Sequence, residues 1–209
     1  MIDPSNSEIK AIADQVKRET GSDDAWVVSK ALFAWLKNNT EYYNQAGSVE
    51  YTQSAAEVLH SRKGDCDELS YLYISLCRAA GIPARFVGGF LVEKAPKSYV
   101  AHVRTEFYDG EWVPVDVAAS ENKNGAARAK SDFIAQQMDA VFGVLSPGHV
   151  QTFVDDGTSA SIVADAGKGV YYDKPFVFFP DVYYDLASYD EMYLASCADG
   201  TRKLVNEKS

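Results

Sequence analysis

The chain has 209 residues, of which 46% are apolar, and its formal net charge is −10 at pH 7. It is long enough to bury a sizeable core as one domain, and its acidic balance argues against nucleic acid and anionic membranes as partners. No run of about 18 apolar residues and no basic-then-apolar leader is visible, so we expect neither a membrane span nor a signal peptide. Three cysteines do not suggest a disulfide framework and favour a cytoplasmic setting, although a domain cut from a larger exported protein would look the same.

Helices are expected in the first third of the chain. Ser7–Thr20 carries apolar residues at helical spacing, and Gly21 follows where such a helix would end. A second helix is expected after Asp24. Ser54 and Glu57 form a capping box, which predicts a short third helix.

The next expected helix begins at Cys66. Asp65 is the expected N-cap residue, and Glu68 at the third helical position completes a second capping box. The apolar stripe of this helix consists of Leu69, Leu72, Tyr73, Leu76 and Ala80. Gly81 and Pro83 would end it. A thiol at a helix N-terminus lies near unpaired N–H groups and the positive end of the dipole, and we expect both to favour the thiolate.

Strand patterns follow the helices, so the order predicts an α+β fold in which a central helix bears the nucleophile. Three strands are expected to form an antiparallel sheet: Ala84–Glu93, Val100–Tyr108 and Glu111–Val117. A further helix is expected from Ser131 to about Val144, and the aromatic stretch Tyr171–Tyr193 is expected to pack rather than to bind a ligand. We assign residues 1–125 to a core and residues 126–209 to an extension packed on it, as one domain.

The loop between the last two strands decides whether His102 and Asp116 can meet. A two-residue loop, Asp109-Gly110, would send their side chains to opposite faces of the sheet. A three-residue loop, Tyr108 to Gly110 with Gly110 left-handed, would put His102 directly opposite Asp116. The longer loop also separates a valine-rich face from a polar face, and we therefore expect it.

Cys66, His102 and Asp116 are the candidate catalytic residues. A histidine base takes the cysteine proton and later returns a proton to a departing amine. A carboxylate on the other ring nitrogen fixes the tautomer and stabilises the imidazolium. The Cys66 backbone N–H is a ready oxyanion donor at a helix N-terminus. Candidates for a second donor are Tyr43, Tyr51 and Gln53.

Four motifs occur in a specific order along this half of the chain. Gly64–Ser70 holds a G-x-C helix start, and Leu76–Arg85 holds an R-x-x-G-I-P-A-R turn into a strand. A histidine strand with His102 and a W-x-x-x-D strand, Trp112–Asp116, come after them. Together the motifs resemble the core of the transglutaminase-like superfamily, over roughly residues 26–120.

This resemblance implies a papain-like fold in which Cys66 is the nucleophile, His102 the base and Asp116 the orienting acid. The chain departs from the family pattern at Arg104, where a tryptophan is common two residues after the histidine. The polar face around Arg104 and Glu106 either lines the substrate cleft or is solvated.

Other candidate residues have simpler interpretations. His60 and His149 show no recognisable partners and are expected to be surface or structural residues. Cys77 lies about 16 Å from Cys66 along the helix, so it and Cys197 are expected to be core or surface thiols. The acids around Cys66 diverge on consecutive helical positions, which favours capping over metal binding. We expect neither a metal nor a cofactor.

Three functional hypotheses remain open. The first is a cysteine enzyme that transfers acyl groups from amide bonds of a peptide or protein substrate through a thioester. Hydrolysis is favoured by the resemblance, and transfer to lysine, as in a true protein-glutamine gamma-glutamyltransferase, is the alternative. The second is a non-catalytic interaction module that keeps the fold, against which the intact triad argues. The third is an arylamine-acyltransferase-like enzyme, whose acyl-CoA pocket is not recognisable in the sequence.

Overall fold

A computed structural model describes residues 1–43, 52–94, 97–118, 138, 142–145, 148–154, 162–165, 169–172, 192–196 and 202–206. The helices of this part are α1 (Ser7–Thr20), α2 (Ala25–Asn39), α3 (Ala55–Ser61) and α4 (Cys66–Ala79). The strands up to β5 are β1 (Glu41–Tyr42), β2 (Lys63–Gly64), β3 (Ala84–Lys94), β4 (Lys97–Tyr108) and β5 (Trp112–Val115). The later strands are β6 (His149–Val154), β7 (Ile162–Asp165), β8 (Gly169–Tyr172), β9 (Met192–Ser196) and β10 (Arg202–Asn206).

The first helices begin and end where their capping residues predict. The Asn6 side chain accepts the first amides of α1, and Gly21 ends the helix in the left-handed conformation with φ 61°. Asp24 caps α2, and Ser54 and Glu57 form the expected capping box at α3. Among the described residues, no helix is long and apolar enough to cross a membrane.

Helix α4 lies at the centre of the fold and contacts α1, α2, α3, β3 and β4. It is buried on all sides from Glu68 to Cys77, so it belongs to the core rather than to the surface. Gly81, with φ 88°, ends it in a Schellman arrangement, in which the Ile82 N–H donates to the Cys77 carbonyl at 2.9 Å. A rigid, buried helix therefore holds Cys66 at its first position.

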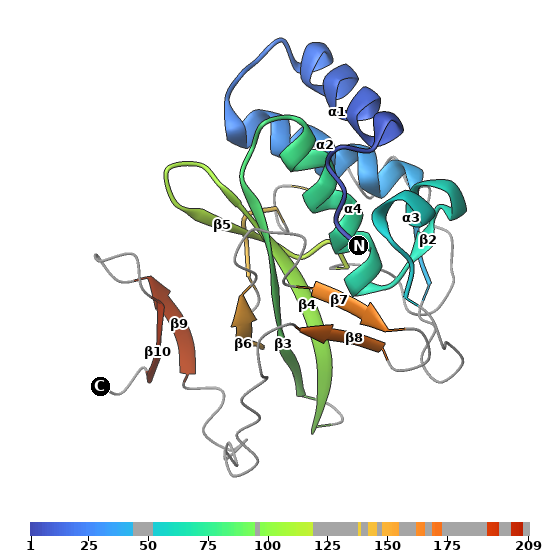
Figure 1. The fold of residues 1–209 in the computed structure, drawn as a ribbon. Coiled ribbons are helices and arrows are strands. Elements are labelled where there is room, and N and C mark those ends of the chain that lie inside the picture. The colour runs from blue at the N-terminus through green and yellow to red at the C-terminus, as the bar shows by residue number, and fades with distance from the viewer. Residues whose placement is uncertain are drawn as a thin grey trace.

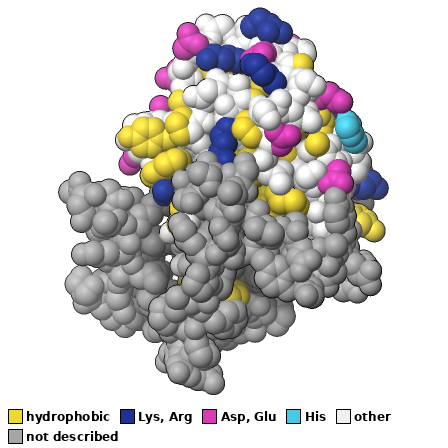
Figure 2. Space-filling model, in the orientation of Figure 1, with side chains coloured by type: hydrophobic (Ala, Val, Ile, Leu, Met, Phe, Trp, Pro, Cys, Tyr) yellow, Lys and Arg dark blue, Asp and Glu magenta, His cyan; other side chains and the backbone are white. Residues whose placement is uncertain are grey.

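The main sheet has the strand order β5-β4-β3-β6, and all its pairings are antiparallel. The helices gather on one side of it, which confirms the α+β class (Figure 1). The short strands β1 and β2 pair in parallel, and β7 with β8 and β9 with β10 form antiparallel pairs. Figure 2 shows acidic and basic side chains interspersed over the described part of one face.

The predicted hairpin register is wrong by two residues. Tyr108 pairs with Trp112, so the three-residue loop is 109–111, with Gly110 left-handed at its centre. The rings of Tyr108 and Trp112 meet edge to face at 5.3 Å, and the Arg85 guanidinium lies 3.9 Å from the Trp112 ring centroid. This aromatic cross-strand pair favours the shifted register, because the predicted loop would have taken Tyr108 out of the ladder.

The shift is by an even number of residues, so the two faces of the hairpin keep their predicted composition. His102 is not directly opposite Asp116, which follows Val115, the last paired residue of β5. Their side chains still emerge on the same face, one beyond the other. The predicted helix from Ser131 to Val144 falls largely outside the described residues. So does the proposed boundary at residue 125, which stays a prediction, although β6 from beyond it pairs with β3.

Candidate active site

Cys66 is positioned by hydrogen bonds within a few residues of it. The Asp65 carboxylate accepts the backbone N–H groups of Asp67 and Glu68, at 3.1 and 3.4 Å. Glu68 reaches back to the Asp65 N–H at 3.2 Å and also accepts the Gln53 N–H at 2.7 Å. Both capping boxes predicted from the sequence are therefore present. Cys66 is the first residue of α4, so its backbone N–H has no acceptor within the helix and points to where an oxyanion could bind.

The electrostatic setting of Cys66 differs from the expectation. Burial raises the pKa of the thiol well above its usual value, and the charges of Asp67 and Asp65 act in the same direction. A hydrogen bond from the Val103 backbone N–H acts against them. The helix N-terminus carries only about half a positive charge, and two adjacent carboxylates outweigh it. The expectation that the helix N-terminus favours the thiolate is therefore wrong for the resting site, where the protonated thiol is favoured.

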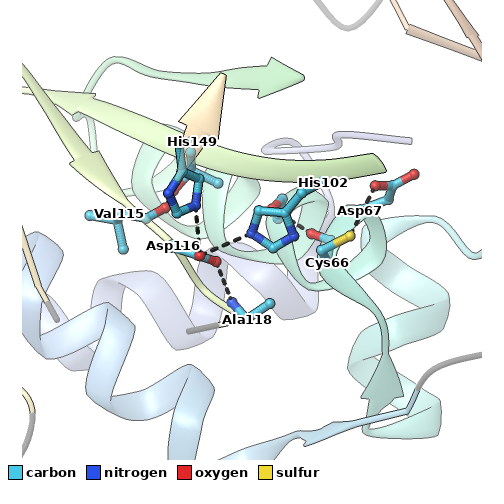
Figure 3. A network of polar contacts seen from close by, with 9 residues as sticks. Cys66, Asp67, His102, Val115, Asp116, Ala118 and His149 are labelled. Carbon is cyan, nitrogen blue, oxygen red and sulfur yellow. Dashed lines mark hydrogen bonds and ion pairs between the residues drawn. The ribbon is translucent and has the colours of Figure 1, made fainter. Parts of the chain in front are cut away.

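The His102 side chain on β4 lies next to this thiol (Figure 3). Its Nε2 lies 2.9 Å from Asp116 Oδ2, and its ring lies between the Asp116 carboxylate and the Cys66 side chain (Figure 3). Asp116 Oδ1 accepts the Ala118 N–H at 3.0 Å. The structure thus brings together the three residues predicted from the sequence, one at the start of α4, one on β4 and one just after β5.

His149 is a member of this cluster that the sequence interpretation missed. It is the first residue of β6, its side chain is buried, and its Nε2 lies 3.1 Å from the same Asp116 Oδ2. The rings of His149 and His102 are 5.2 Å apart, centroid to centroid. The expectation of a residue without a specific partner is corrected for His149. The β-branched and aromatic residues after Gly148, Val150 and Thr152–Val154, could have indicated a strand there, but not the partner of His149. His60, by contrast, is exposed and pairs with Glu8 at 2.9 Å.

The protonation of the cluster follows from its acceptor. Burial acts to raise the pKa of Asp116, but hydrogen bonds and charges from His102 and His149 outweigh it and hold the pKa well below its usual value. An ionised carboxylate only accepts hydrogen bonds, so both Nε2 atoms must carry a hydrogen. Neutral His102 then has its lone pair on Nδ1, the nitrogen on the Cys66 side of the ring (Figure 3). That is the tautomer that a general base for the thiol requires.

Asp67 introduces a second titrating group beside the thiol. Cys66 Sγ lies 3.5 Å from Asp67 Oδ1. Burial and then the charge of Asp65 raise the pKa of Asp67 to about 7, while its contact with Cys66 and the charge of His102 lower it. Near neutral pH this carboxyl is therefore partly protonated. Its ionised form opposes formation of the thiolate.

Tyr42 on β1 is a further polar group near the nucleophile. It pairs with Gly64 in the ladder that leads into α4, and its side chain is partly buried. Burial raises the pKa of Tyr42 to about 12, and negative charges of the site act in the same direction. Those charges belong to Cys66, Asp65, Asp116 and Asp67. The phenol therefore stays protonated and able to donate a hydrogen bond.

The three predicted candidates for a second oxyanion donor fit less well than Tyr42. Tyr43 is 51% exposed, and the Lys63 ammonium lies over its ring. The Gln53 side-chain amide donates to the Lys63 carbonyl at 3.2 Å and to Glu68 at 3.4 Å. Tyr51 lies outside the described residues.

Arg104 and Glu106 on the polar side of the hairpin are not solvated but are buried in an ion-pair network. Glu106 accepts from Arg104 at 2.6 Å and from Arg85 at 2.6 and 2.8 Å. Arg104 also donates to Gln151 on β6 at 2.8 Å. At the position where members of the family often carry a tryptophan, Arg104 therefore joins β4 to β6. Arg85 is held in the same network by its ion pair with Glu106.

Among the described residues, two groups of side chains have the residue types and spacing of metal ligands. Within each group the donor atoms lie within 4.8 Å of one another: His102, Asp116 and His149 in one, Asp65, Cys66 and Asp67 in the other. Hydrogen bonds account for both arrangements, through the histidine N–H groups in the first and helix capping in the second. Cys77 is fully buried, and burial raises its pKa to about 12, which fits a core thiol. Cys197 lies outside the described residues.

Comparison with known families agrees with the order of the motifs. Residues 9–117, just over half of the chain, match the family model of the Transglutaminase-like superfamily. The match contains Cys66, His102 and Asp116 and ends before β6. His149 therefore lies beyond the matched region.

Similar proteins are distant in sequence. ML0607 of Mycobacterium leprae, an uncharacterized protein, is 26% identical over 91 residues, which are 44% of this chain and 31% of that protein. A candidate cysteine protease from Cytophaga hutchinsonii superposes with a TM-score of 0.47 at 21% identity, over 79% of this chain and 49% of its own. The periplasmic domain of TgpA from Pseudomonas aeruginosa superposes with a TM-score of 0.41 at 19% identity, over 66% of this chain and 48% of its own. The chain spans about a third of the curated relative's length.

Proposed function

Since the chain belongs to the transglutaminase-like superfamily, we propose that it is a cysteine-dependent acyl-transfer enzyme that acts on amide bonds of peptides or proteins through a thioester. One observation carries the proposal. The His102 ring is held by Asp116 on one side and faces Cys66 on the other (Figure 3). A nucleophile, a base and an orienting acid in that relation are the requirement for acyl transfer through a thioester.

In the proposed reaction the thiol is deprotonated as it attacks. Because the pKa of Cys66 is raised, His102 Nδ1 takes the Sγ proton while Sγ adds to the substrate carbonyl carbon. The Asp116 carboxylate stabilises the imidazolium that results. The imidazolium then protonates the departing ammonia or amine, the C–N bond breaks, and an acyl group remains on Cys66 as a thioester.

The negative charge that develops on the carbonyl oxygen needs donors. The Cys66 backbone N–H is the first donor, at the start of α4, where the helix dipole adds to its effect. We assign the second to the Tyr42 phenol, whose raised pKa keeps its hydrogen in place.

Hydrolysis is the resolution of the thioester that we favour. Water, activated by His102 after the amine has left, would attack the thioester and release the acid. Transfer to a lysine amine would instead make the protein a true transglutaminase. This preference rests on the family resemblance.

The test is the intact mass of products after incubation with glutamine-containing and lysine-containing peptides. Conversion of glutamine to glutamate with release of ammonia would identify an amidase, cleavage of the chain a protease, and a joined product a transglutaminase. Each product must disappear with Cys66→Ala and with His102→Ala. The absence of any Cys66-dependent product over a broad peptide library would favour the non-catalytic interaction module.

A further inference from the structure

The Asp116 carboxylate has two histidine partners, and the triad accounts for only one of them. His102 and His149 direct their Nε2 atoms to the same oxygen, Oδ2, at 2.9 and 3.1 Å. Both interactions are nearly excluded from solvent, since the Asp116 and His149 side chains are 7% and 9% exposed. A buried hydrogen bond to a charged group contributes more than a neutral one. His149 is therefore too well placed to be an accidental neighbour.

The backbone explains how a residue from β6 reaches this oxygen. Gly89 on β3 pairs with His102 on one side and with Gln151 on the other, so β3 lies between the two histidine-bearing strands. A Cβ on Gly89 would collide with the Val150 carbonyl oxygen. Only glycine lets β6 approach so closely, at the point where its register with β3 shifts.

Two side chains of β6 reach over β3 to residues on its other side. His149 reaches Asp116, and Gln151, two residues further along the same face, accepts from Arg104 on β4 at 2.8 Å. The first contact reaches the carboxylate that pairs with His102, and the second joins β6 to β4 through Arg104. Only the first of them touches the triad.

We propose that His149 is a positioning residue that holds the Asp116 carboxylate in the orientation that fixes the tautomer of His102. The donors come from three places: His102 on β4, His149 on β6 and the backbone of Ala118. Without His149, the carboxylate keeps two of its three donors, His102 on Oδ2 and the Ala118 N–H on Oδ1, and its plane is fixed less firmly. His102 would then lose its fixed ring orientation and its preference for hydrogen on Nε2. The role rests on the proposed acyl-transfer function.

Two substitutions of His149 separate positioning from packing. His149→Phe keeps a ring of similar size and removes the donor, whereas His149→Gln retains an amide N–H able to reach Asp116. The matched control is Gln151→Met, which removes the other contact of β6 and leaves Asp116 with all its donors. The rate of Cys66 alkylation by iodoacetamide at pH 7, followed by peptide mapping, requires no knowledge of the substrate. Nitrogen NMR of isotope-labelled histidine reports the His102 tautomer independently of any reactivity.

We expect His149→Phe to slow alkylation of Cys66 about tenfold, because one partner of a charged hydrogen bond is lost. His149→Gln should recover most of the rate, and Gln151→Met should retain it. NMR should show His102 with hydrogen on Nε2 in the unmodified protein and a mixture of tautomers in His149→Phe. An unchanged rate and tautomer in His149→Phe would overturn the proposal, and so would a stoichiometric metal ion bound at the three residues. If His102→Ala leaves the rate unchanged, the proposed function fails, while the NMR result still decides the role of His149.

Discussion

The two parts of the candidate site are held in place in different ways. At the start of α4, Cys66 is positioned by capping contacts between residues two or three positions apart. At the edge where β4, β5 and β6 meet, Asp116 is positioned by side chains 14 and 33 positions away in the chain. The position of the proposed nucleophile therefore depends on local sequence, and that of the proposed orienting acid depends on the assembled sheet. Catalysis in this protein should require both, and substitutions can separate them.

The largest effect should come from removing either part. We expect Cys66→Ala and His102→Ala each to lower kcat/KM by about 10⁴-fold or more. The kcat/KM of the double variant should be no lower than that of either single variant, because the two residues act as a unit. The comparison uses initial rates on whichever peptide is turned over. The control His60→Ala removes an exposed histidine paired with Glu8 and should retain activity. Additive losses in the double variant would show that the two parts act independently.

A smaller loss of activity is expected when one proposed hydrogen-bond donor to the oxyanion is removed. Tyr42→Phe removes one donor and should reduce kcat by about 10²-fold with little change in KM, since the hydrogen bond is needed mainly in the transition state. Tyr43→Phe, at the exposed neighbouring tyrosine, serves as the matched control. Equal rates for the two variants would remove Tyr42 from the proposed mechanism.

The sheet side can be disturbed without touching a polar group of the site. Gly89→Ala forces a Cβ against the Val150 carbonyl and should cost about 1–3 kcal/mol of stability. By moving β6 it should also slow alkylation of Cys66 about tenfold, as the loss of a charged hydrogen bond would. Gly81→Ala, at φ 88° with open space around it, should cost about 1 kcal/mol and leave the rate unchanged. If both variants alter the rate equally, β6 has no specific role at Asp116.

A substitution at the start of α4 should instead accelerate alkylation of Cys66. Asp67→Asn removes a charge that opposes the thiolate and should accelerate alkylation of Cys66 about tenfold for each unit by which the thiol pKa falls. Because the pKa of Asp67 is about 7, the gain should be small below pH 6, where Asp67 is already neutral, and largest above pH 8.

Asp67→Asn should also change the stability of the protein, by an amount that depends on pH. The folded pKa of Asp67 lies above its unfolded value of 3.8, so its favourable contribution is present at low pH and is lost as the pH rises through 7. The Tm advantage of Asp67→Asn over the unmodified protein should therefore grow between about pH 4 and pH 8. An advantage independent of pH would show that Asp67 titrates as a solvated carboxyl.

The contrast between the two parts also explains what the sequence predicts. The bounds of α1 and the start of α4 follow from residues such as Asn6, Gly21 and Asp65, whose effect is local. The hairpin loop has the predicted length but lies one residue further on, because the pairing of Tyr108 with Trp112 decided the register. Alternation still placed His102 and Asp116 on one face, since a shift by two residues preserves the faces.

Contacts between residues far apart in the chain could not be predicted from local sequence patterns. The partner of His149 depends on the close approach of β6 over Gly89, which no local pattern of β6 specifies. The charge balance at Cys66 was also missed, because the helix dipole was considered without the carboxylates of Asp65 and Asp67. In both cases the prediction failed because several groups act on the same side chain, and their combined effect depends on the folded structure.

The most direct measurement is the intact mass of the protein after brief exposure to p-nitrophenyl acetate, followed by hydroxylamine. We predict one acetyl group on Cys66, released by hydroxylamine as a thioester must be, and none at the same time point in His102→Ala. Acetylation that spares Cys66, or that proceeds equally fast without His102, would contradict a Cys66 nucleophile activated by His102.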